Sequence, residues 1–102
     1  HCHFGAWFAD RNGLPEAIIA SVLLHHTPSE ASQHKRLVRL TAAGDHLANH
    51  YQRHGSFEDY DVTLNRGIEA LDELLPLNVQ ERFAEGAEML FEGIERDCTA
   101  AA

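Results

Sequence analysis

Two adjacent histidines, His25 and His26, follow the most apolar stretch of the chain, residues 17–24. A buried imidazole needs partners for its ring nitrogens, because an unpaired buried polar group costs about 1–3 kcal/mol. Neutral imidazole is the commonest metal-ligating side chain, so the pair is a candidate metal site. The alternative is an exposed helix end, where protonated rings interact favourably with the helix dipole.

Asp45 is a second candidate ligand. It follows Val38 by seven residues and Thr41 by four, which places it at the margin of the buried stripe of an expected helix. A carboxylate there can reach a neighbouring helix, where it could bind a cation or accept a hydrogen bond from a histidine. The structural alternative is an acceptor for a nearby backbone amide.

Three further histidines, His46, His50 and His54, recur at intervals of four residues. This spacing aligns them on one helical stripe, as in helices that bind a metal through two imidazoles. The stripe lies away from the apolar positions Leu40 and Leu47, so we expect it to form a polar surface exposed to solvent.

Other chemistries lack their motifs. The seven glycines form no Gly-x-Gly group, and no serine lies in a Gly-x-Ser-x-Gly turn. The two cysteines, Cys2 and Cys98, are too few for a disulfide framework and have the wrong spacing for a zinc knuckle. We interpret both as reduced thiols of a cytoplasmic protein.

The apolar residues follow a helical period almost throughout, which predicts an all-α fold of about five helices. The expected helices cover Cys2 to Asp10, Glu16 to His26, Ser32 to His54, Leu64 to Leu75, and a last helix after Asn78. The second is apolar on nearly all sides and is expected to be the buried central helix. Asn78 and Glu81 form a capping-box pattern for the last one.

The charge is divided unevenly along these 102 residues, a length that makes one domain. Residues 1–54 hold all eight histidines and five basic against four acidic residues, whereas residues 55–102 hold three basic against twelve acidic. An acidic chain without a basic stripe is a poor nucleic-acid binder. No apolar run is long enough for a membrane span.

Several short motifs follow one another along residues 1–54. They are, in chain order, His1 four residues before Gly5-Ala6, then Gly13-Leu14-Pro15, His25-His26 before Thr27-Pro28, Leu37-Val38, and Asp45 before Leu47-Ala48. This order resembles the second half of an HD-superfamily domain, and most closely its HDOD branch. The acidic residues 55–102 would then form a helical C-terminal extension packed on the same core.

The resemblance implies an HD-like helical bundle and a divalent-metal site. Catalytic HD-superfamily proteins use bound Fe, Mn, Zn or Ni to activate water for attack on a phosphate ester. The residues that fall on ligand-type positions of the family are His1, His25, His26 and Asp45.

Two features depart from the catalytic pattern. No histidine here is followed by aspartate, although the family's His-Asp pair lies upstream of the matched segment. Residues 27–30 read Thr-Pro-Ser-Glu where the cyclic-dinucleotide phosphodiesterase branch has Gly-Tyr-Pro. These departures favour a non-catalytic HDOD-like signalling or interaction module. The alternatives are a metal-dependent phosphohydrolase with its His-Asp pair supplied upstream, and an unrelated helical domain that binds a basic partner.

The expected partners follow from the same resemblance. A part of a larger helical domain would pack Trp7, Phe8 and the helix from Glu16 against preceding helices of that domain, another protein or a second copy of the chain. We expect neither nucleic acid nor a membrane as partner.

Overall fold

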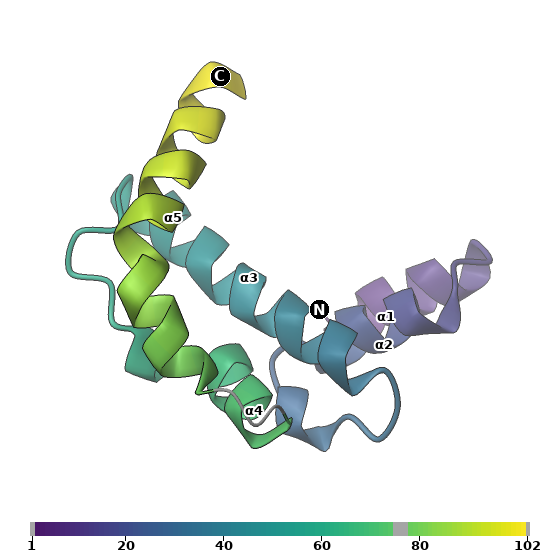
Figure 1. The fold of residues 1–102 in the computed structure, drawn as a ribbon. Helices are drawn as coiled ribbons and strands as arrows, with labels where there is room; N and C mark the ends of the chain where they lie inside the picture. Colours follow the sequence, from purple (N-terminus) through teal and green to yellow (C-terminus); the bar gives the residue numbers. More distant parts are fainter. Residues whose placement is uncertain (1, 75–77, 102) are drawn as a thin grey trace.

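The computed structural model describes residues 2–74 and 78–101, and the side chains of residues 2–74 and 78–97. These residues form five α-helices and two short 3-10 helices, with no strand among them, so the predicted all-α fold is confirmed (Figure 1). The elements are α1 (Cys2–Arg11), α2 (Glu16–Leu24), η1 (Pro28–Glu30), α3 (Lys35–His54), η2 (Val62–Leu64), α4 (Arg66–Leu74) and α5 (Val79–Ala101). The expected end of the fourth helix at Leu75-Pro76 lies outside the described residues.

Helices α1 and α2 form a hairpin at one end of the molecule (Figure 1). Gly13 lies between them with φ +69°, a conformation that glycine adopts without steric cost. A Cβ at Gly5 would lie 2.7 Å from Cγ1 of Val22, so glycine at this position is what lets the two helices approach closely. The hairpin therefore places the first residue of α1 beside the last turn of α2.

The central helix is α3, and the expectation that the second helix would be central was wrong. Helix α3 packs against α2, η1 and α4, whereas Ser21 is the one buried residue of α2 and Ile18 is 41% exposed. A helix that is apolar all round has no preferred face, so its composition does not determine which side is covered. The molecule is also flat, measuring 38 × 37 × 17 Å, which leaves part of α2 uncovered.

The core lies between α3 and α4. Val38 and Ala42 of α3 and Ile68 and Leu71 of α4 are all buried. Gly67 brings the two backbones together, because a Cβ there would lie 2.7 Å from the Cα of Ala43. Helix α3 begins at Lys35 rather than at the expected Ser32, but it ends where predicted, at His54, with Gly55 as its C-cap at φ +71°.

Helix α5 is held by aromatic stacking and by a carboxylate from α4. The rings of Phe57 and Phe91 stack with centroids 4.2 Å apart. Asp72 accepts hydrogen bonds from the first backbone amides of α5, those of Val79 and Gln80. The predicted capping box is not formed as such, since the Asn78 amide bonds the Glu81 side chain rather than a backbone group. Asp72 therefore supplies the cap from a different helix.

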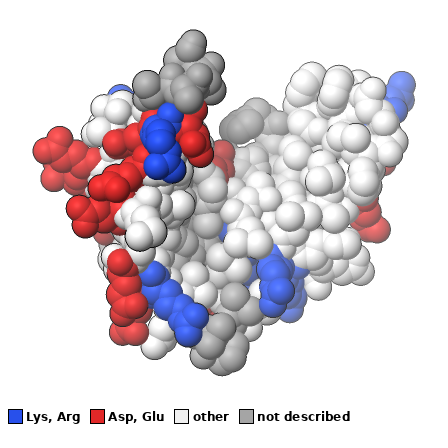
Figure 2. Space-filling view, turned by 45° about the horizontal axis from the view of Figure 1, so that its top comes forward, with Lys and Arg blue, Asp and Glu red and all other residues white. Residues whose placement is uncertain are grey.

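Acidic side chains are concentrated on one side of the molecule (Figure 2), whereas large exposed apolar side chains occur on α1, on α2 and on the acidic helix α5. Figure 2 shows acidic side chains gathered over the C-terminal helices, while the side formed by α1 and α2 is mostly uncharged. The exposed acidic residues among the described side chains of α5 are Glu81, Glu85, Glu88, Glu92 and Asp97. Glu95 is only half-exposed, and its carboxylate accepts a 3.4 Å hydrogen bond from the Phe57 amide. Among the described helices, none combines the length and the apolarity that crossing a membrane requires.

Candidate histidine and metal site

His25 forms the C-cap of α2, and its ring nitrogens face two different acceptors. Nδ1 lies 2.7 Å from the carbonyl oxygen of Val22, to which it donates, because a carbonyl can only accept. Nε2 lies 4.0 Å from Oδ2 of Asp45 on α3, and the His25 side chain is only 14% exposed. Asn49 donates a 3.1 Å hydrogen bond to the same Asp45 oxygen. The structure thus brings an imidazole of α2 and a carboxylate of α3 together.

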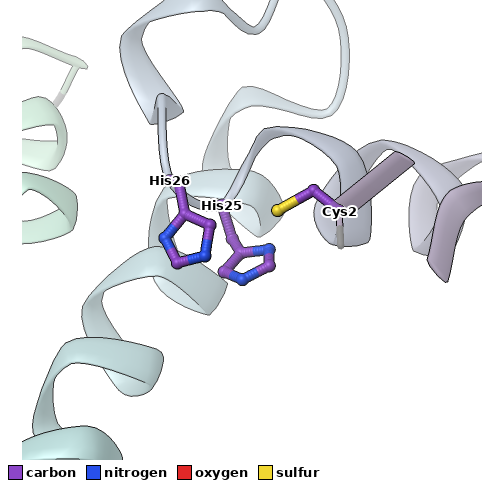
Figure 3. A group of neighbouring side chains, drawn as sticks. All are labelled: Cys2, His25 and His26. Atoms are coloured by element: carbon purple, nitrogen blue, oxygen red, sulfur yellow. The ribbon is translucent and has the colours of Figure 1, made fainter. Parts of the chain in front are cut away.

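His26 and Cys2 complete a group of three metal-ligating side chains around His25. The rings of His25 and His26 lie with centroids 4.2 Å apart and tilted by 39°. One ligand atom from each of the two histidines and the Cys2 sulfur all lie within 4.8 Å of one another, and Figure 3 shows the sulfur directed toward the two rings. Cys2 and His25 are half-buried, whereas His26 is exposed.

Cys2 was missed as a site residue in the sequence, because 22 residues separate it from His25. The similar lengths of the two predicted helices are the feature of the sequence that could have indicated the proximity of Cys2 to His25. Helices α1 and α2 contain 10 and 9 residues and run as an antiparallel hairpin. Two antiparallel helices of nearly equal length place the start of the first beside the end of the second.

Three of the four predicted ligands line one pocket, but Asp45 does not belong to the group of neighbouring ligand atoms that Cys2, His25 and His26 form. His25, His26 and Asp45 line one pocket of about 720 Å³ between α2, α3 and the segment before α4. His1 lies outside the described residues. The donor set present, two imidazoles and a carboxylate, is one that divalent transition metals accept.

The stripe of His46, His50 and His54 lines the same pocket, which corrects its assignment to a solvent-exposed face. Only His54 is exposed, while His46 and His50 are half-buried. A 2.8 Å hydrogen bond joins Nδ1 of His46 to the Tyr60 hydroxyl, and the His50 ring packs edge-on against the Tyr60 ring. The segment after α3 folds back over this stripe through Tyr60, and the helical period of α3 alone does not reveal such a contact.

The pocket combines groups of both charges. Burial, followed by the charge of His50, holds the pKa of His46 below its usual value, although Asp45 opposes the shift. Burial raises the pKa of the Tyr60 hydroxyl. The cations Arg53 and Arg66 also line the wall. Such a pocket can hold an anionic group beside a metal ion or accept protons near neutral pH.

We expect His46 to titrate below its usual value of 6.5 and His50→Gln to raise its pKa, because this variant removes a nearby positive charge. The measurement is an NMR pH titration in the presence of a chelator, with the His46 resonance assigned from His46→Gln.

The pKa of His46 is lower in the folded protein than in the unfolded chain, so the unfolded chain binds more protons as the pH falls from about 6.5 toward the folded pKa. Stability should therefore fall over this range, and less so in His46→Gln. If the pKa of His46 is the same in His50→Gln as in the wild type, the assigned effect of the His50 charge is wrong.

Comparisons with protein-family models, with curated proteins and with solved structures return no match to this chain.

Proposed function

We propose that this chain is a non-catalytic interaction module, similar to the regulatory HDOD domains, and that it binds another protein through the outer face of α1. The observation that carries the proposal is the exposure of Trp7 and Phe8, each 55% accessible to solvent, together with the still more exposed Phe4. Large aromatic side chains gathered on one surface are typical of protein-binding sites.

The three aromatic residues lie on one side of α1, because positions 4, 7 and 8 are separated by three and four residues. The rings of Phe4 and Trp7 lie 6.0 Å apart, and the guanidinium of Arg11 lies 5.4 Å from the Trp7 ring. The opposite side of α1 carries the buried Ala6 and Ala9. The helix therefore buries its small residues and presents its large ones, which favours a second partner for the outer face.

Site-specific photo-crosslinking tests this role. A photoreactive phenylalanine analogue at position 8, in the protein expressed in its native cells, is expected to give one discrete cross-linked product. The matched control is the same analogue at Met89 of α5, which is 80% exposed and also apolar, and which should give none. A product of two copies of the chain would identify the partner as the chain itself.

The proposal fails if position 8 gives no discrete product, or gives the same products as position 89. It also fails if the chain hydrolyses phosphate esters. The His25–Asp45 pair in a pocket with two arginines favours the phosphohydrolase as the second candidate. That function predicts metal-dependent hydrolysis of bis(p-nitrophenyl) phosphate, which Asp45→Asn abolishes.

A further inference from the structure

We propose that Cys2, His25 and His26 bind a single thiophilic transition-metal ion of the Zn²⁺ class, which ties α1 to the end of α2. The site differs from the ligand set that the HD resemblance implies, because a cysteine sulfur takes part and Asp45 is not required. It is also independent of the interaction role, since none of its three residues belongs to the aromatic set of Phe4, Trp7 and Phe8.

The spacing of the three side chains supports the proposal. Their ligand atoms lie within 4.8 Å of one another. In a tetrahedral zinc site, bonds of about 2.0–2.3 Å place ligand atoms roughly 3.6 Å apart. Side-chain rotations that bring the atoms together by about 1 Å would complete the site. The hairpin backbone can stay in place.

The ligand chemistry points to the metal class. One thiolate and two imidazoles suit Zn²⁺, whereas Mg²⁺ and Ca²⁺ select oxygen ligands. Three protein ligands leave a fourth position for water or for an external ligand. Because His26 is exposed, that position is accessible from solvent.

The surroundings of His25 would orient it as a ligand. A metal-bound histidine characteristically donates its other ring nitrogen to a carbonyl or a carboxylate. Here the Val22 carbonyl accepts from Nδ1, and the Asp45 carboxylate lies 4.0 Å from Nε2. Whichever nitrogen binds the ion, the other has an acceptor nearby.

The hairpin fixes the cysteine relative to the histidines. Gly5 and Val22 bring α1 and α2 into close contact one turn from Cys2. The nearby residue His3 also lies in α1 but is exposed and is not part of the group. It therefore provides a matched control for loss of a histidine near the site.

Cobalt substitution of the full chain tests the site. The protein is kept reduced with a non-thiol reductant, stripped with a chelator, and titrated with Co²⁺ and then with Zn²⁺. We expect a thiolate-to-cobalt charge-transfer absorption that saturates at one equivalent and is displaced by Zn²⁺. Cys2→Ser should abolish the band and weaken Co²⁺ binding at least about tenfold. Cys98→Ser and His3→Ala should keep both.

Further variants separate this site from its competitors. His25→Ala and His26→Ala should each weaken binding as Cys2→Ser does, with helicity by circular dichroism unchanged. His50→Ala, which changes one residue of the His46, His50 and His54 stripe, should leave the band intact. The proposal is overturned if the band survives Cys2→Ser or disappears in Cys98→Ser. It is also overturned if His1→Ala and Asp45→Asn remove metal binding while Cys2→Ser does not, because the HD-type ligand set would then hold the ion.

Discussion

Gly67→Ala is expected to lower the free energy of unfolding by about 3 kcal/mol, at the upper end of the usual cost of overpacking. A Cβ at this position would lie 2.7 Å from both the Cα of Ala43 and the carbonyl oxygen of Arg39. These are backbone atoms of α3, so no side chain can rotate away to make room. The two central helices would have to separate.

The control is Gly44→Ala on α3, the helix against which Gly67 of α4 packs. A Cβ at Gly44 meets nothing within 4 Å, and the residue is exposed. Alanine in a helix interior is favoured over glycine by about 0.5–1 kcal/mol, so this variant should be more stable than the wild type. Chemical denaturation followed by circular dichroism measures both changes. Equal effects of the two substitutions would show that α3 and α4 are not packed as closely as described.

Asn65→Ala is expected to cost a similar amount, about 3 kcal/mol, for a different reason. Asn65 is 0% exposed, and its side chain donates to the Ala43 carbonyl and to the Tyr60 hydroxyl. Its Oδ1 accepts from the Ile68 amide and so caps α4. Alanine would leave the buried backbone groups of Ala43 and Ile68 without these partners.

Two comparisons separate the cap from the network. Asn65→Ser keeps a hydroxyl that can accept from the Ile68 amide, so its loss of stability should be smaller than that of Asn65→Ala. Asn49→Ala removes an exposed amide that bonds only a neighbouring turn of its own helix, and it should change stability by less than about 0.5 kcal/mol. Because Asn65 also contacts Tyr60, its loss should disturb the wall of the histidine pocket. An Asn65→Ala variant as stable as Asn49→Ala would contradict this account.

The sequence predicted the helices well because their limits depend on local chemistry. Gly55 ends α3 in a left-handed conformation, and Pro15 precedes the first residue of α2. The position of Asp45 on the helical wheel also allowed it to reach a histidine of another helix, as one of several alternatives, and the structure places its carboxylate 4.0 Å from His25. A helix end, or the face of a helix on which a side chain lies, is determined by residues within one or two turns along the chain.

The parts that the sequence did not predict depend on contacts between distant residues. Cys2 meets His25 only because two helices of similar length form a hairpin, and Asn65 becomes structural only because α3 passes over it. The covering of His46 and His50 depends on the path of residues 55–62, which no periodicity describes. The apolar composition of α2 likewise indicated burial but not which neighbour would cover it.

The hairpin has a consequence for how the molecule opens. In the described chain, α1 packs substantially on α2 alone, whereas α3 contacts elements on several sides. Detaching α1 would therefore expose less surface than global unfolding and should cost less free energy. Opening also carries Cys2 away from His25 and His26. An ion held by all three would oppose it, and the free metal concentration would then set the fraction of molecules with α1 released.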